Sequence, residues 1–175
     1  MVVPVSASGF PPTDGGAPVV VIGVGNEFRR DDGAGPAVVA RLRDLAPDGV
    51  RLVITDGEPT RLIDAWAGSA LAVVVDAVRA QPPDTGPPRP GTVHRFVVDG
   101  PGARTGRAAS SHGFGFDDAI GLAVALDRMP ARLIVHAIEA ADLNQGPGLT
   151  PPVAAAVGVV AAAVLDDLGP YIQGP

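Results

Sequence analysis

The stretch Val19-Val-Val-Ile-Gly-Val-Gly-Asn-Glu-Phe-Arg-Arg-Asp-Asp-Gly-Ala-Gly-Pro36 decides how this chain folds. It begins with an apolar, β-branched run, which is typical of a strand buried on both faces of a parallel sheet. Gly23 and Gly25 then allow the backbone to turn tightly and to approach a neighbour closely. The loop that follows carries Asp31 and Asp32, and apolar residues at helical spacing come after it. Such strand-to-helix loops lie at the carboxyl edge of open α/β sheets, where ligands bind.

Alternating strand and helix patterns continue along the rest of the chain and predict its fold class. Further strands are expected at residues 51–56, 71–76, 92–98 and 132–138, and further helices at residues 58–67 and 116–128 and from residue 151 onward. The mixed polarity of residues 92–98 indicates an edge strand, antiparallel to its neighbour. Helical spacing predicts four inward-facing residues in the helix at 116–128: Ile120, Leu122, Ala123 and Leu126. We therefore predict a three-layer α/β sandwich, a mostly parallel sheet with helices on both faces.

The composition of the two ends predicts one domain between flexible segments. Residues 1–18 are small and rich in Pro and Gly, without a positive charge before an apolar core, so we expect a disordered segment and no signal peptide. Residues 19–168 form the predicted single α/β domain, and residues 169–175 a flexible tail. The apolar run at 153–165 is too short to span a bilayer and indicates a packed helix. We therefore expect a cytoplasmic protein.

The residue types that are missing exclude several kinds of chemistry. The chain has no Cys, which excludes a thiol nucleophile, and all 13 of its basic residues are Arg. Without Lys there is no Schiff-base chemistry and no Lys-dependent phosphate loop. The net charge of −6 argues against nucleic acid and anionic membranes as partners, and an aromatic content of 4% argues against base-stacking surfaces.

Three residues are candidates for a shared site. Asp32 and Asp76 each follow an apolar strand and are expected at the same edge of the sheet, and His112 lies in a Gly/Ser loop just before a helix. Two carboxylates and an imidazole with open coordination positions suit Zn, Ni or Fe better than Ca or Mg. Taken singly, Asp32 has the alternative role of a helix N-cap, Asp76 that of a turn residue, and His112 that of a surface or capping residue.

Other patterns have weaker functional interpretations. His94 and His136 lie inside predicted strands, where a structural role is favoured. A nucleophile system built on Ser110 or Ser111 beside His112 is the minor option, because no Gly-x-Ser-x-Gly elbow is present. Gly23-Val-Gly25 lacks the third glycine of a dinucleotide-binding loop, since Phe28 stands in its place.

Five blocks of the sequence, taken in order, resemble the [NiFe]-hydrogenase maturation endopeptidases. They are Gly23 to Pro36, Asp56-Gly57, Val75-Asp76-Ala77, Ser111-His112-Gly113 and Gly148-Leu-Thr-Pro151, within a resemblance over roughly residues 19–167. The resemblance implies a five-stranded twisted sheet between helices, and an endopeptidase that trims a C-terminal extension from the hydrogenase large-subunit precursor after nickel insertion. Asp32, Asp76 and His112 would be the catalytic, metal-contacting residues. Many members read Asp-Gly-Gly where this chain has Asp56-Gly57-Glu58, and the loops at 79–90 and 99–109 are peculiar to this chain.

The resulting hypothesis is that Asp32, Asp76 and His112 grip nickel held by the substrate, so the protein needs no metal of its own at rest and no organic cofactor. Gripping the metal would position the scissile peptide and make cleavage conditional on nickel loading. Whether the metal or a carboxylate activates water stays open. One alternative is a non-catalytic α/β module that binds a small ligand or a protein. Another is a self-sufficient metallohydrolase, which would carry its own stoichiometric metal.

Overall fold

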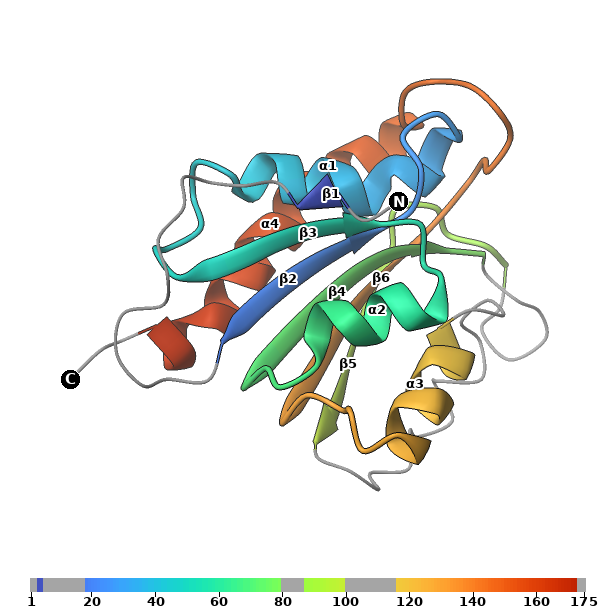
Figure 1. Ribbon diagram of the computed structural model, residues 1–175. Helices are drawn as coiled ribbons and strands as arrows, with labels where there is room; N and C mark the ends of the chain where they lie inside the picture. The colour runs from blue at the N-terminus through green and yellow to red at the C-terminus, as the bar shows by residue number, and fades with distance from the viewer. Residues whose placement is uncertain (1–2, 5–17, 80–86, 100–115, 173–175) are drawn as a thin grey trace.

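A computed structural model describes residues 3–4, 18–79, 87–99 and 116–172 of the chain. Its sheet has the strand order β1-β3-β2-β4-β6-β5 (Figure 1). The strands are β1 (Val3–Pro4), β2 (Val19–Val24), β3 (Val50–Thr55), β4 (Leu71–Val78), β5 (Val93–Asp99) and β6 (Arg132–Glu139). The four central strands β3, β2, β4 and β6 run parallel, and β5 pairs with β6 antiparallel at one edge. The predicted five strands and the antiparallel edge strand are therefore confirmed.

Helices cover both faces of this sheet, as a three-layer sandwich requires. One face carries α1 (Ala34–Leu42) and α4 (Pro151–Ile172), and the other carries α2 (Pro59–Trp66) and α3 (Phe116–Ala125) (Figure 1). Successive residues of each strand point to opposite faces, so each strand contributes to two separate cores. In β2, for example, Val19 and Val21 pack against α1 and α4, whereas Val20 and Ile22 pack against α2 and α3. Continuous apolar strands are the result of burial on both sides.

Elements at both ends of the chain extend beyond the predicted domain bounds of 19–168. Within the segment 1–18 that was predicted to be disordered, Val3–Pro4 pairs antiparallel with β3; of the rest of that segment, only Pro18 lies among the described residues. At the other end, α4 continues through Ile172, into the segment 169–175 that was predicted to be a flexible tail. Leu168 is fully buried, so the last turns of the helix remain attached to the core.

The inward face of α3 also differs from the prediction. Ala123 is buried and Ile120 half-buried as expected, but Leu122 and Leu126 are 37% and 53% exposed. Leu126 directly follows the last helical residue, Ala125, and its N–H still donates to the carbonyl of Leu122 at 3.0 Å. Phe116 and Ala119 are the residues that fill the core beside Ala123. Helical spacing was therefore right, but the buried stripe lies at other positions of the helix.

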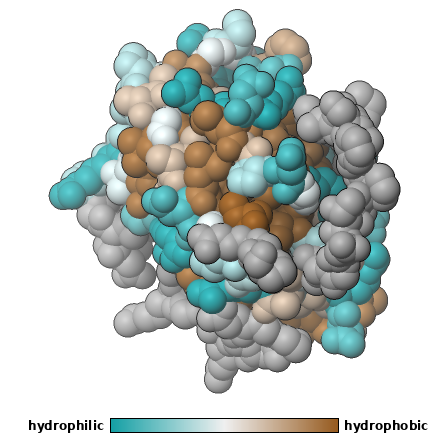
Figure 2. All heavy atoms as spheres, turned by 90° about the vertical axis from the view of Figure 1, so that its left-hand side faces the viewer, coloured by the Kyte–Doolittle hydropathy of each residue, from teal (hydrophilic) through white to brown (hydrophobic). Residues whose placement is uncertain are grey.

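Among the described residues, one helix, α4, is long and apolar enough to cross a membrane by length and composition alone. In the structure it packs lengthwise beside α1, and a stripe of its side chains is buried in the core: Val153, Ala156, Val160, Ala161, Val164 and Leu168. Apolar atoms also reach the surface on the side where the parallel strands begin, and hydrophilic atoms surround much of this apolar area (Figure 2). That side lies opposite the carboxyl edge.

Candidate functional site

A cleft of about 420 Å³ opens at the carboxyl edge of the sheet. Its lining residues are Val24, Gly25, Arg29, Asp32, Asp56, Gly57, Leu62, Asp76, Ala77, Val78, Arg79, Phe116 and Leu143. They come from the ends of β2 and β4, from the loops that follow β2, β3 and β6, and from the first turns of α2 and α3. The cleft thus lies where ligands bind in open α/β sheets.

The first loop (residues 25–33) carries Asp32 into this cleft. It ends in a short 3-10 helix, Arg30–Gly33, which joins directly onto α1. The backbone N–H of Asn26 donates to Asp32 Oδ2 at 3.0 Å, and Arg29 lies 3.8 Å from the same oxygen. Gly25 has φ +129°, and a Cβ there would collide with the backbone oxygen of Asp32. The glycine of the motif is therefore required for the close packing that places Asp32.

Asp76 reaches the same cleft from the end of β4. Five buried residues precede it, and Asp76 itself keeps part of its surface open to the cleft. Burial raises the pKa of Asp76 to about 7; the backbone N–H of Ala77 opposes this rise, and the nearby Asp32 carboxylate adds to it. The structure therefore brings together two of the three predicted site residues, Asp32 and Asp76, closely enough for one charge to affect the other.

The third predicted residue, His112, lies outside the described residues, as do Ser110 and Ser111. Within the described part of the chain, no group of three or more His, Cys, Asp or Glu side chains is placed to hold a metal ion. Asp32 and Asp76 would supply two oxygen ligands, which is an incomplete set for a transition metal. The three-residue metal site accordingly stays a prediction.

Sequence reasoning did not identify the role of Asp31, the neighbour of Asp32. Asp31 is fully buried and accepts four hydrogen bonds from the last loop (residues 140–150): from the backbone N–H groups of Ala141 (2.8 Å), Asp142 (2.9 Å) and Thr150 (2.7 Å), and from the Thr150 hydroxyl (2.9 Å). Burial raises the pKa of Asp31, but these hydrogen bonds outweigh it and lower the pKa below its ordinary value. Asp31 therefore holds the first and last loops together as one unit.

Asp56 is a third carboxylate in the cleft, directly after β3. Its side chain pairs with Arg61 and accepts the backbone N–H of Glu58 at 3.3 Å. Burial raises the pKa of Asp56, and the contacts with Arg61 and Glu58 reverse this and lower it. Its position at the end of a strand is the same signal that singles out Asp76. In the sequence, however, Asp56-Gly57 indicates only a turn and a block of the family resemblance.

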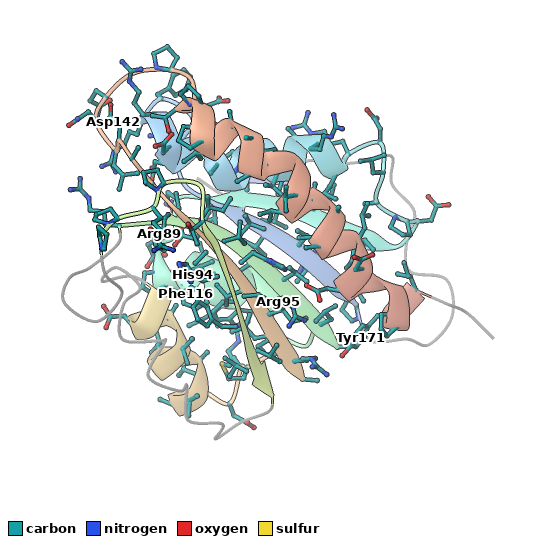
Figure 3. The ribbon with its side chains drawn as sticks, turned by 180° about the vertical axis from the view of Figure 1, so that it is seen from behind. Arg89, His94, Arg95, Phe116, Asp142 and Tyr171 are labelled. Atoms are coloured by element: carbon teal, nitrogen blue, oxygen red, sulfur yellow. The ribbon has the colours of Figure 1, made fainter. Side chains whose placement is uncertain are left out.

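His94 and His136 are each paired with a carboxylate, in agreement with a structural role. His94 Nε2 lies 2.7 Å from Glu139 Oε1, and His136 Nε2 lies 2.8 Å from Asp167 Oδ2. His136 is 1% exposed, and burial lowers its pKa despite the contact with Asp167. His94 lies on β5, on the same side of the molecule as Arg89 and Phe116 (Figure 3). Neither histidine lines the cleft.

Comparisons with known proteins agree with this architecture. The family model HycI, described as hydrogenase maturation protease, matches residues 37–167. No curated protein sequence matches the chain. Among solved structures, the hydrogenase maturating endopeptidase HybD from Escherichia coli is 24% identical with a TM-score of 0.70, covering 87% of this chain and 93% of its own.

Two further solved structures have the same fold. The [NiFe] hydrogenase maturation protease HybD from Thermococcus kodakarensis is 25% identical, with a TM-score of 0.62, over 86% of this chain and 98% of its own. The endopeptidase HycI from Escherichia coli is 20% identical, with a TM-score of 0.60, over 85% of this chain and 90% of its own. The likeness therefore extends over nearly the full length of each structure.

Proposed function

The chain belongs to the hydrogenase maturation protease family, and from this premise we propose that it removes a C-terminal peptide from the precursor of a [NiFe]-hydrogenase large subunit after nickel insertion. It is an endopeptidase of hydrogenase maturation by its family and fold. The timing of cleavage, the precursor as partner and a cytoplasmic location are parts of the proposal.

The observation that carries the proposal is the meeting of Asp32 and Asp76 in one cleft. The two carboxylates come from different strand-loop units, and their proximity raises the free energy of the doubly ionised state. A divalent cation between them would remove that cost, because it attracts both charges. The pair is thus suited to hold a divalent cation, and in the proposed function this cation is the nickel of the substrate.

In the proposed mechanism, Asp32, Asp76 and His112 bind nickel that the precursor already holds. Metal binding would displace the proton that Asp76 keeps near neutral pH, so binding is coupled to deprotonation. The grip on the metal fixes the scissile peptide in the cleft, which converts an encounter into an oriented, effectively intramolecular reaction. A precursor without nickel lacks this attachment and is left uncut.

The first test is Asp76→Asn, which keeps the shape of the side chain and removes its charge. We expect processing of nickel-loaded precursor to fall by about 100-fold or more, because the peptide is no longer held in place. Mass spectrometry of the precursor, with and without the protein, measures the loss of the C-terminal peptide. Asp64→Asn, at an exposed position of α2, serves as the matched control and should process normally.

The outcomes separate the alternatives. Normal processing by the Asp76→Asn variant would contradict the assignment of Asp76. A stoichiometric metal in the purified protein, with loss of activity after chelation and no dependence on substrate nickel, would indicate a self-sufficient metallohydrolase. Absence of any cleavage product, together with binding that is indifferent to nickel, would indicate a non-catalytic module.

A further inference from the structure

Phe28 is a large aromatic residue that the fold leaves exposed beside the cleft. Its exposed fraction is 64%, and the next residue in the chain, Arg29, lines the cleft. Leu143 of the last loop also lines the cleft, and its carbonyl oxygen accepts a hydrogen bond from Arg29 at 3.4 Å. An aromatic side chain with this exposure gains little from the core and leaves most of its apolar area available to a partner.

The backbone around Phe28 is held firmly although its side chain is exposed. The N–H of Phe28 donates to Asn26 Oδ1 at 2.9 Å, and its carbonyl accepts the N–H of Gly146 at 2.8 Å. The N–H of Arg30 donates to the carbonyl of Gly146 at 2.8 Å, and Arg30 adopts φ +50°, which is uncommon for a non-glycine residue. The buried Asp31 completes this attachment. Phe28 is therefore presented on a rigid support, which lowers the entropic cost of binding through it.

The charges next to Phe28 indicate the kind of partner. The side chains of Arg29 and Arg30 are 45% and 47% exposed, on a chain whose net charge is −6. Their contacts with Asp32 and Asp142 are 3.8 and 3.7 Å long, so both guanidinium groups keep donors available to a partner. Aromatic residues, including Phe, and Arg are enriched in protein interfaces relative to the rest of the surface. The surface formed by Phe28, Arg29 and Arg30 is therefore complementary to a partner with an apolar recess that carboxylates surround.

We propose that Phe28, flanked by Arg29 and Arg30, docks on the folded part of the large-subunit precursor, next to its scissile segment. This inference rests on the proposed function, because the occupant of the cleft is taken to be the precursor. A polypeptide that occupies the cleft would contact Arg29, which lines it. The surface of the precursor beside that polypeptide would then lie next to Phe28. A second copy of this chain on the same surface would instead obstruct the cleft, so the precursor is the occupant that the geometry favours.

The test compares Phe28→Ala with Leu45→Ala. Leu45 is 50% exposed and follows the C-terminal end of α1, away from the carboxyl edge of the sheet, so it resembles Phe28 in exposure and differs in location (Figure 1). With folded, nickel-loaded precursor, we expect Phe28→Ala to raise Kd and KM by about 10- to 30-fold, with kcat and Tm near those of the unchanged protein. Phe28→Leu should restore most of the affinity for the precursor, and Leu45→Ala should behave as the wild-type protein does.

Kd is measured by titration and KM by cleavage, so that the two proposals can fail separately. If the precursor binds through Phe28 but is never cut, the docking surface stands and the proposed function fails. If Phe28→Ala binds and processes the precursor normally, the docking surface is wrong while the proposed function stands. Three other outcomes would each overturn the docking proposal. The first is a loss of kcat and Tm in Phe28→Ala without a change in Kd, and the second is absence of binding by the wild-type protein. The third is self-association that Phe28→Ala abolishes without affecting precursor binding.

Discussion

Asp76 and Asp32 share one cleft, but their surroundings treat their charges differently. Asp32 accepts a hydrogen bond from the backbone N–H of Asn26, and Arg29 lies 3.8 Å from its carboxylate. Asp76 follows five buried residues, and the N–H of Ala77 is the polar contact that favours its charge. At the scale of single residues, burial therefore raises the pKa of Asp76 to about 7 in a cleft that this residue shares with a second carboxylate.

The pH dependence of the unfolding free energy of the metal-free protein tests the raised pKa of Asp76. The pKa of Asp76 is raised from 3.8 in the unfolded chain to about 7 in the folded protein. Between these two pH values the folded state holds a proton that the unfolded state has lost. The free energy of unfolding therefore falls as the pH rises through this range. Asp76→Asn removes that cost. We expect it to be more stable than the unchanged protein at pH 8, by on the order of 2–4 kcal/mol, and about equal at pH 4.

Chemical denaturation at the two pH values gives both free energies of unfolding. An Asp76→Asn variant that is less stable than the unchanged protein at pH 8, or equally affected at both pH values, would show that burial of the Asp76 charge does not cause the pH dependence. Asp64→Asn provides the reference for removing an exposed carboxylate.

At the scale of elements, the close contact of α1 with β2 and β4 sets the position of the first loop. Gly35 of α1 lies against the backbone of these strands: a Cβ there would come within 2.6 Å of the nitrogen of Val24 and the oxygen of Val75. Gly23 of β2 likewise faces the carbonyl of Gly35. The glycines of the opening motif therefore allow a helix to rest on strands without an intervening side chain, close to Asp32.

Gly35→Ala tests this packing against Gly158→Ala. The first change forces α1 away from backbone atoms that cannot rotate aside, and we expect a loss of about 3 kcal/mol or more in unfolding free energy. Gly158 lies in α4, where a Cβ meets nothing within 4 Å, so Gly158→Ala should stabilise the protein by up to about 1 kcal/mol. Thermal and denaturant unfolding measure both. Equal effects of the two substitutions would contradict the packing argument.

At the scale of the whole molecule, a polar contact joins the last helix to the sheet edge. Asp167 of α4 is 10% exposed; it accepts a 2.6 Å hydrogen bond from Arg95 of β5 and lies 2.8 Å from His136 of β6. Burial raises the pKa of Asp167, but the contacts with Arg95 and His136 outweigh it and lower the pKa below 3.8. The contact connects residues 95, 136 and 167, so it forms only when the sheet and α4 are both in place.

Asp167→Asn removes the charge from this contact and should cost about 2–3 kcal/mol of unfolding free energy at pH 7, because it leaves Arg95 and His136 without their anion. Since the pKa of Asp167 is lowered, its contribution is present above about pH 3.8 and is lost as pH falls through the folded-state value. Denaturation curves should therefore converge in acid. Asp64→Asn, which breaks an exposed pair with Arg128, should cost less than about 1 kcal/mol; a similar cost for both would contradict the role of burial.

Local sequence patterns were enough to predict the alternation of strands and helices, the antiparallel edge strand and the placement of Asp32 and Asp76 at one edge. These follow from local patterns, because the spacing of apolar residues and the residue at a strand's end are properties of short segments. Burial on α3 was only partly predictable: the spacing was right, but which residues of the helix face the core depends on its contact with α2 and the sheet.

The different roles of Asp31 and Asp32 follow from long-range contacts that the folded chain makes. The two residues are chemically identical neighbours, yet one is fully buried and the other lines the cleft. The N–H groups that donate to Asp31 at 2.7–2.9 Å belong to residues at least 110 positions away in the sequence. No local pattern encodes a contact of that range, and for the same reason the exposure of Phe28 beside the cleft emerged only from the fold.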